Sequence, residues 1–297
     1  MDRFACRLGG KILEILHTLE EKKQNLKLLL REYLKEDVCV AFSGGVDSSL
    51  LLVMAWEAAK ESKRTVYALT MDTVLHPAAD LEAARLVLER TGAKHVVLKL
   101  NELAVPEIRM NPLDRCYLCK KELYTRMLKF GEEHGVRILL EGSNEDDLHV
   151  YRPGLKAVKE LGVKSPLAML HITKDEVRAL AREYGIPVAD RPSSPCLATR
   201  LPYGTEIDLT LLERIDKAEE FIRGLDFYNV RVRVHKDIAR VEIDQKDFFK
   251  FLDCRQEITR KLKDLGFTYI TLDLEGFRSG SMDAGRREEN GYADREN

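Results

Sequence analysis

Short apolar runs alternate with longer stretches of helical periodicity over the first two thirds of the chain. The apolar runs, rich in β-branched residues, predict buried strands at 37–42, 65–70, 95–100 and 137–140. The stretches around them predict helices at about 11–34, 50–62, 78–91, 121–134 and 173–184. Strands that alternate with helices form a parallel sheet covered on both faces, so the pattern predicts an α/β fold.

A different pattern begins after Pro202-Tyr203-Gly204. The predicted elements of this second part are a helix, two strands, a helix and a last strand, at 209–224, 230–235, 238–243, 246–265 and 269–273. Their order is typical of a small α+β unit. We therefore expect three segments, a first domain, a smaller second domain and a disordered charged tail, over 1–203, 204–283 and 284–297.

Length and charge limit the classes of protein to which this chain can belong. The 297 residues suffice for two domains, and 48 basic against 50 acidic side chains give a formal net charge of −2. This balance argues against non-specific binding to nucleic acid. No apolar run is long enough to span a bilayer, and the first residues lack a signal-peptide pattern. We expect a soluble, cytoplasmic protein that binds neither nucleic acid nor membrane.

A Gly/Ser-rich loop lies where the first predicted strand turns into a helix. The first N–H groups of a helix are free and its dipole is positive there, so the position favours an anion. Glycines allow a phosphate to approach the backbone, and serines add hydroxyl donors. The candidate pyrophosphate-binding residues are Ser43, Gly44, Gly45, Asp47, Ser48 and Ser49. Without the lysine of a Walker A motif, Asp47 indicates either a ligand that arrives with Mg²⁺ or an aspartate that holds the turn; a turn without ligand is the alternative.

Two later features point to the same edge of the sheet. The turn at 141–147 contains Gly142 and Asp146 and follows a predicted strand, which favours a Mg²⁺ and nucleotide edge over a simple Asx-rich turn. Lys174 begins a predicted helix, where the helix dipole does not favour a cation. A lysine there makes sense if it faces a phosphate, while a solvated surface lysine is the alternative.

Three of the six cysteines form a candidate constellation. Cys116 and Cys119 form a Cys-x-x-Cys pair, and Cys196 lies in a proline-punctuated loop. Three thiolates suit a 4Fe–4S cluster with one iron left open for another ligand. The alternatives are a zinc site with His149 or His235 as fourth ligand, a redox dithiol, and a sacrificial or nucleophilic Cys196.

The strand predicted at 230–235 places Arg231 and Arg233 on one face. Two arginines on one face can clamp a phosphate or carboxylate. The alternative is the solvent face of a two-sided sheet.

These motifs together resemble those of a known family. The Ser-Gly-Gly-x-Asp-Ser loop is similar to that of the ATP pyrophosphatases, or PP-loop proteins. Further motifs follow in order at 111–120, 141–147, 151–154, 192–200, 230–233 and 276–281. From about residue 12 to 283 the chain resembles the LarE family, the ATP-dependent pyridinium-3,5-dicarboxylate mononucleotide sulfurtransferases that build the nickel-pincer cofactor of lactate racemase.

The resemblance implies a PP-loop (adenine nucleotide alpha hydrolase-like) domain in which ATP adenylates a substrate carboxylate and pyrophosphate leaves. Sulfur then displaces AMP to give a thiocarboxylate, and the cycle repeats on the second carboxylate. In the family, the end of the second strand meets adenine, here at Thr70 and Met71. The arginines implied to bind substrate are Arg200, Arg231 and Arg233.

The three cysteines match one of two groups within the family that the chain resembles. Some members give up the sulfur of the cysteine that matches Cys196, whereas members with three cysteines carry a 4Fe–4S cluster that binds an extra sulfide. The resemblance therefore implies ATP, Mg²⁺ and a 4Fe–4S cluster held by Cys116, Cys119 and Cys196. It also implies a sulfide source as partner and a homo-oligomer. Glu219 and Asp247 are candidates for an additional metal site.

Other functions are open at this point. A PP-loop tRNA thiolase with an Fe–S cluster would need a basic RNA-binding face, which the net charge disfavours. A ligase of the NAD or GMP synthetase kind has no use for three cysteines in its site. A non-catalytic iron–sulfur or zinc protein would not release pyrophosphate from ATP.

Overall fold

The computed structural model describes residues 18–76, 79–150, 152–193, 195–278 and 280–282. The predicted tail at 284–297 and the first part of the predicted N-terminal helix lie outside the described residues. Four parallel strands form a sheet in the order β3-β2-β1-β4. Their bounds are Val38–Ala41 for β1, Val66–Thr73 for β2, Lys94–Leu100 for β3 and Ile138–Leu140 for β4. The predicted α/β fold is therefore confirmed.

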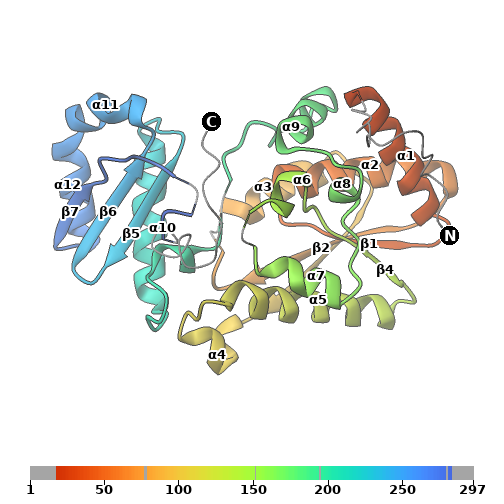
Figure 1. Cartoon of the computed structure of the whole chain (residues 1–297), viewed down its shortest axis with the longest axis horizontal. Helices are drawn as coiled ribbons and strands as arrows, with labels where there is room; N and C mark the ends of the chain where they lie inside the picture. The colour runs from red at the N-terminus through yellow and green to blue at the C-terminus, as the bar shows by residue number, and fades with distance from the viewer. Residues whose placement is uncertain (1–17, 77–78, 151, 194, 279, 283–297) are drawn as a thin grey trace, which may run out of the picture.

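Helices cover both faces of this sheet, as Figure 1 shows. The helices on one face are α1 Leu19–Tyr33, α2 Val46–Ser62, α3 Ala79–Leu88 and α9 Lys174–Glu183. Those on the other face are α5 Arg115–Glu133 and α7 Gly154–Glu160. Alternate residues of β1 pack on opposite faces of the sheet. Val38 and Val40 belong to the core with α1 and α2, while Cys39 packs with Phe130 of α5.

Short helices follow the strands at the edge where the phosphate loop lies. They are η1 Glu102–Ala104, α4 Pro106–Arg109, α6 Glu145–Leu148, α8 Pro166–Met169 and η2 Leu197–Arg200. The start of α9 is a capping box, because Thr173 and Glu176 each bond the other's backbone N–H. This helix start was predicted from the sequence.

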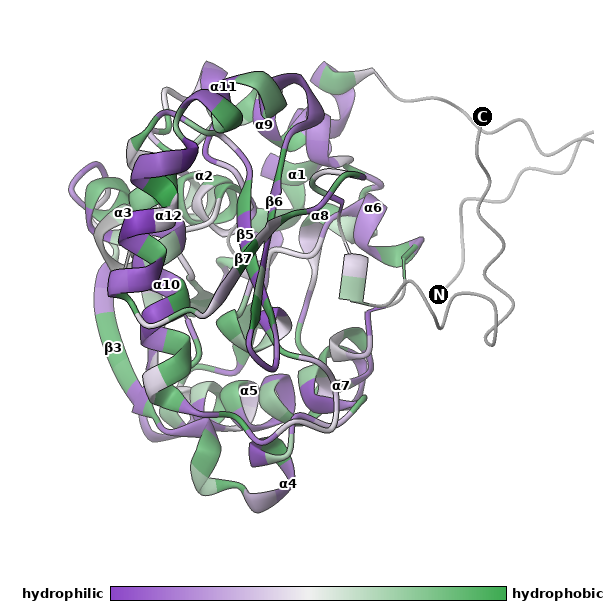
Figure 2. Ribbon diagram, turned by 90° about the vertical axis from the view of Figure 1, so that its left-hand side faces the viewer, coloured by the Kyte–Doolittle hydropathy of each residue, from purple (hydrophilic) through white to green (hydrophobic). Residues whose placement is uncertain are grey.

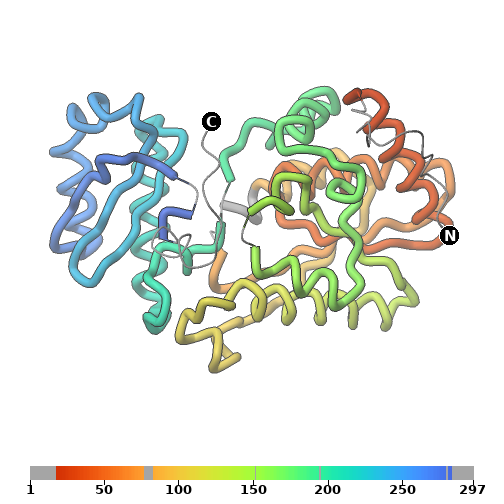
Figure 3. The backbone as a smooth tube through the Cα atoms, viewed as in Figure 1, coloured from red at the N-terminus to blue at the C-terminus, as the bar shows by residue number. Residues whose placement is uncertain are grey.

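The C-terminal part forms its own three-stranded sheet, which Figure 3 shows at the opposite end of the long axis from α1. Its elements are α10 Leu209–Gly224, β5 Val230–His235, β6 Ile238–Ile243, η3 Gln245–Asp247, α11 Phe248–Asp253, α12 Arg255–Asp264 and β7 Tyr269–Leu272. Strand β5 pairs antiparallel with β6, which pairs parallel with β7.

Hydrophilic and hydrophobic residues alternate along α10 and α12, as Figure 2 shows from the side of this unit. The buried residues of α12 are Ile258 and Leu262. They join a hydrophobic core that also contains Leu197 and Leu201, which precede residue 203. The segment before the predicted boundary therefore packs in the core of the C-terminal unit. A boundary at 203 stays a prediction.

Three predicted helices differ from those observed, and one of them, predicted from 50, begins at Val46. The helix predicted over 246–265 is broken into α11 and α12 at Cys254, whose ψ of 0° departs from helical geometry. The helix predicted from 121 begins at Arg115. Asn111, buried at a positive φ of 49°, accepts a hydrogen bond from Arg115 Nη1 and donates one to the Pro202 oxygen at 2.8 Å. These bonds fix the start of α5, and the long-range bond to Pro202 is invisible in a local pattern.

Candidate active site

The phosphate loop has the predicted strand–turn–helix geometry. Gly44 has a φ of 77°, which a side chain would strain, and extended Gly45 is the N-cap of α2. The Ser48 hydroxyl donates to the Gly45 carbonyl at 3.1 Å and accepts from the Ser43 amide at 3.3 Å. The Ser49 hydroxyl is buried without a hydrogen-bond partner among the described residues. The loop is thus closed on itself, with the first N–H groups of α2 beside it.

Two distant segments converge on Asp47 in this loop. Asn144, which follows β4, donates from Nδ2 to Asp47 Oδ1 at 3.0 Å. Lys174 at the start of α9 forms an ion pair with Asp47 Oδ2 through Nζ. The lysine therefore faces the loop rather than solvent, and its cation balances the acid of the loop.

The turn at 141–147 lies against the loop. A Cβ on Gly142 would come within 2.9 Å of the Ser48 amide nitrogen, so this position requires glycine. Asp146 Oδ2 accepts from the Lys174 amide at 2.5 Å and so fixes the start of α9. The carboxylates of this turn that line the cavity are instead Glu141 and Asp147. Burial raises the pKa of Asp147 despite its ion pair with Arg152 at 2.8 Å.

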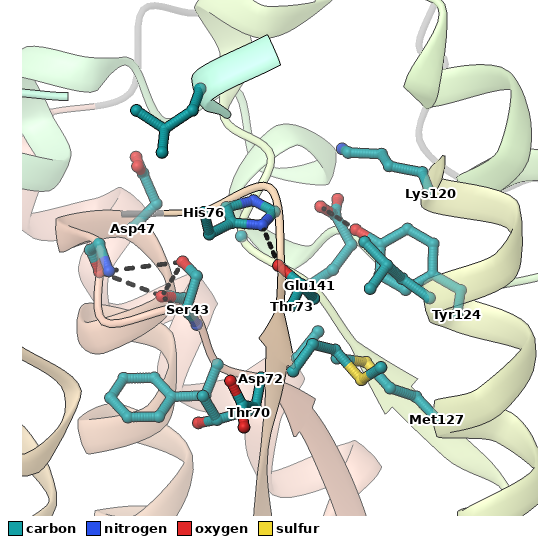
Figure 4. A pocket seen from close by; sticks show the side chains of 18 of the residues that line it. Ser43, Asp47, Thr70, Asp72, Thr73, His76, Lys120, Tyr124, Met127 and Glu141 are labelled. Atoms are coloured by element: carbon teal, nitrogen blue, oxygen red, sulfur yellow. Dashed lines mark hydrogen bonds between the residues drawn. The ribbon is translucent and has the colours of Figure 1, made fainter. Parts of the chain in front are cut away.

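A cavity of about 590 Å³ opens between the loop and α5. Figure 4 shows Ser43 and Asp47 on one side and Tyr124, Glu141 and Lys120 on the other. Further lining residues include Thr70, Met71, Met127, Leu197 and Asp216. The strand end predicted to meet adenine is therefore in the wall of the cavity.

Several residues that line the cavity were not singled out from the sequence. Glu141 is 4% exposed and accepts from the Ser143 hydroxyl at 2.8 Å and the Tyr124 hydroxyl at 3.4 Å. Tyr124 and Lys120 lie on the helix that carries the Cys-x-x-Cys pair. The one sign of these residues in the sequence was that polar side chains recur at successive turns of the predicted helix after the Cys-x-x-Cys pair.

Replacing Lys174 by methionine tests the cation at the loop. We expect the KM for ATP in pyrophosphate release to rise about tenfold, equivalent to one lost contact of about 1.4 kcal/mol. The reason is that Asp47 is left without its cation where the phosphates of ATP would add further negative charge. The control is Lys129→Met on α5, because Lys129 lies outside the cavity. An unchanged KM would show that Lys174 only holds the loop.

The three cysteines share one charged environment. Cys116 and Cys119 lie at the start of α5 and Cys196 immediately precedes η2. Arg115, 1% exposed, donates from Nη2 to Cys116 Sγ at 3.5 Å, and its charge interacts with all three sulfurs. Burial raises the pKa of Cys119 and of Cys196, although Arg115 opposes this effect at both. The described cysteines form no disulfide.

The three cysteines are suitable ligands for a cluster, but the structure does not hold them together as a metal site. No three His, Cys, Asp or Glu residues within the described part of the chain are already grouped to hold a metal ion. Cys119 and Cys196 nevertheless contact the same hydrophobic core, and Arg115 would offset the negative charge of a thiolate-bound cluster. The residue types and the nearby cation fit such a group.

The predicted substrate arginines are buried, so the solvent-face alternative for Arg231 and Arg233 is wrong: each is 5% exposed. Arg233 forms an ion pair with Glu242 at 3.1 Å. Arg231 donates to the Val230 and Ser193 carbonyls at 2.7 Å. Burial, and then the charge of Arg200, lowers the pKa of Arg231 to about 10. A buried guanidinium bonded to carbonyls and beside other cations is a favourable place for an anion.

Arg200 and Glu219 form a buried pair. Arg200 Nε and Nη2 donate to the two carboxylate oxygens of Glu219 at 2.7 and 2.8 Å, and each side chain is 1% exposed. Glu219 also accepts from the Val232 amide at 2.9 Å. The structure thus corrects the expectation for Glu219: its oxygens are occupied by protein donors. Neither Glu219 nor Asp247, in η3, belongs to a group of metal ligands among the residues described.

Comparison with known proteins decides the family. A family model described as a PP-loop domain matches residues 18–151. The pyridinium-3,5-bisthiocarboxylic acid mononucleotide synthase of Lactiplantibacillus plantarum is 37% identical over 265 residues, which cover 89% of this chain and 95% of the relative. The chain belongs to the LarE family. An uncharacterized protein of Synechocystis sp. is 36% identical over 266 residues, covering 89% of this LarE chain and 97% of that relative.

A tRNA-specific 2-thiouridylase MnmA of Rickettsia africae matches more distantly. It is 28% identical over 197 residues, and the match covers 53% of this LarE chain and 52% of the relative. The comparisons therefore support a LarE-like sulfur transferase with an ATP-binding PP-loop domain. Within the residues that the structure describes, no helix has the length and apolar character needed to cross a membrane.

Proposed function

We propose that the protein is an ATP-dependent sulfur transferase that converts pyridinium-3,5-dicarboxylate mononucleotide into thiocarboxylates during nickel-pincer cofactor synthesis. The observation that carries this proposal is the match to a synthase of the corresponding bisthiocarboxylic acid over nearly its whole length. The cavity supports it, because it is bounded by the phosphate loop on one side and by Leu197, next to Cys196, on another.

In the first step, a substrate carboxylate oxygen attacks the α-phosphorus of ATP. The bond from that phosphorus to pyrophosphate breaks, and the electron pair leaves with pyrophosphate. The Ser43 hydroxyl and the first amides of α2 stabilise its negative charge. Asp47 would hold the Mg²⁺ that accompanies ATP, and Thr70 and Met71 would contact adenine.

In the second step, sulfide attacks the carbonyl carbon of the acyl-adenylate. The carbon–sulfur bond forms, the carbon–oxygen bond to AMP breaks, and AMP leaves with the electron pair. Cys116, Cys119 and Cys196 would hold a 4Fe–4S cluster, which would supply sulfide bound at its open iron. Arg231, with Arg200 and Arg233 beside it, would bind the substrate phosphate. The proposal includes an external sulfide source and a homo-oligomer.

The first experiment is anaerobic purification of the whole protein with measurement of iron, acid-labile sulfide and pyrophosphate release. We expect about four iron and four sulfide per chain, lost in Cys116→Ala, while substrate-dependent pyrophosphate release persists in that variant. Absence of iron, with Cys196 converted to dehydroalanine after turnover, would replace the cluster with the sacrificial form of the reaction. Absence of substrate-dependent pyrophosphate release would overturn the proposal.

A tRNA thiolase is the second candidate, and the matches to 2-thiouridylases favour it. The formal net charge of −2 is a poor basis for binding an RNA backbone. Binding to bulk tRNA that weakens steeply with salt, together with tRNA-dependent pyrophosphate release, would decide for this candidate.

A further inference from the structure

The segment that follows β2 brings a histidine into the cavity that none of the sequence motifs contains. His76 and Thr73 both line the cavity, and His76 Nδ1 lies 2.6 Å from Thr73 Oγ1. Figure 4 shows the His76 ring between the Ser43 and Asp47 side and the Glu141 and Lys120 side. Its position is therefore central in the site rather than peripheral.

A buried carboxylate stands behind this pair. Glu102, in η1, is 1% exposed, and its Oε2 accepts from the Val74 amide at 3.3 Å. Burial raises the pKa of Glu102. Glu102 thus holds the backbone of the turn that carries Thr73 and His76.

The proton positions follow from the available donors. With the Thr73 hydroxyl as the donor to His76 Nδ1, the neutral imidazole carries its hydrogen on Nε2. This arrangement fixes the ring orientation and leaves Nε2–H for a ligand.

The same turn is bonded to the segment of Cys196. The Leu197 amide donates to the Leu75 carbonyl at 2.8 Å. Leu197 is next to Cys196 in the chain, and Leu75 is next to His76. Pyrophosphate is proposed at the phosphate loop and adenine at Thr70 and Met71, so the α-phosphate must lie between them. His76 follows Met71 along the same chain and faces this middle position.

We propose that His76 is a catalytic residue that donates a hydrogen bond from Nε2–H to the α-phosphate of the acyl-adenylate, and that Thr73 and Glu102 position it. The inference rests on the proposed function and adds a residue to it. The α-phosphate keeps its charge during adenylation and gains negative charge when AMP leaves. A hydrogen-bond donor there therefore accelerates the displacement of AMP more than the release of pyrophosphate. The proton stays on Nε2 throughout.

The test separates the two steps in single-turnover reactions of the anaerobic holoenzyme, with substrate, sulfide and ATP labelled in the α-phosphate. For His76→Phe we expect pyrophosphate release within about threefold of the native rate and AMP displacement slowed about 10²-fold, as for loss of one oxyanion donor. His76→Lys, which keeps an N–H donor, is expected to recover most of the loss. The control is His171→Gln, whose exposed side chain pairs with Glu145 outside the cavity.

Thr73→Val tests the positioning role. We expect it to slow AMP displacement, and we expect its effect to vanish in a His76→Phe background, because Thr73 acts through His76. AMP displacement at the native rate in His76→Phe would overturn the inference. So would an equal loss of both steps, which would make His76 an ATP-binding residue. A native enzyme that releases no pyrophosphate with substrate would instead refute the proposed function itself.

Discussion

Gly142→Ala is expected to slow substrate-dependent pyrophosphate release about 10²-fold, the cost of misplacing a reacting group by a fraction of an ångström to an ångström. The added methyl would lie 2.9 Å from the Ser48 amide nitrogen and 3.2 Å from Asp47 Cβ. Both neighbours belong to the first turn of α2, so the phosphate loop itself must shift to relieve the contact. The amides proposed to receive pyrophosphate then no longer point at one position.

Gly224→Ala is the matched control for this variant. Gly224 ends α10, and a Cβ built there meets no atom within 4 Å. Both variants are expected to unfold near the native temperature, measured by circular dichroism. Native activity in Gly142→Ala would show that the 141–147 turn moves freely away from the loop and does not define it.

Glu219→Ala is expected to lower the free energy of unfolding by about 3–5 kcal/mol, the usual effect of removing one partner of a buried ion pair. The substitution leaves the Arg200 guanidinium, 1% exposed, without its carboxylate, and it removes the acceptor of the Val232 amide. Urea unfolding measures the change. Glu220→Ala, at an exposed position of the same helix, is the control and is expected to change stability by less than about 0.5 kcal/mol.

The same pair predicts a dependence on pH. Burial acts to raise the pKa of Glu219, but the charge and hydrogen bonds of Arg200 outweigh it and hold that pKa below its ordinary value of 4.5. A carboxyl group with a lowered folded pKa stabilises the fold above its unfolded pKa and loses this contribution as pH falls below it. The native protein should therefore lose more stability than Glu219→Ala on acidification below about pH 4.5. Parallel losses in the two proteins would contradict this account.

The elements that the sequence predicts best are those with strong local signals. The parallel strands, the capped start of α9 and the alternation in β5 were all visible in short windows. The break at Cys254 was not, because both halves carry helical periodicity. Local patterns determine the type of an element more firmly than its ends.

Burial of charge was the main feature that could not be predicted. Arg233 was expected either to bind an anion or to face solvent, but its partner Glu242 lies across the hairpin and compensates its charge. Lys174 meets Asp47 from 127 residues away. Such pairs depend on the folded path of the chain, so sequence spacing does not identify the partners. For Lys174 the helix start indicated an anion nearby, but the anion expected was a phosphate and not Asp47.

The bond between Leu197 and Leu75 has a consequence for local motion. Leu197 and Leu75 both pack in the core of the C-terminal unit, although Leu75 follows β2 of the nucleotide half, and Figure 3 shows the chain crossing between the two ends of the molecule. The amide hydrogen of Leu197 reaches solvent when this bond opens. Its rate of exchange with deuterium therefore measures how often the contact between the two units opens.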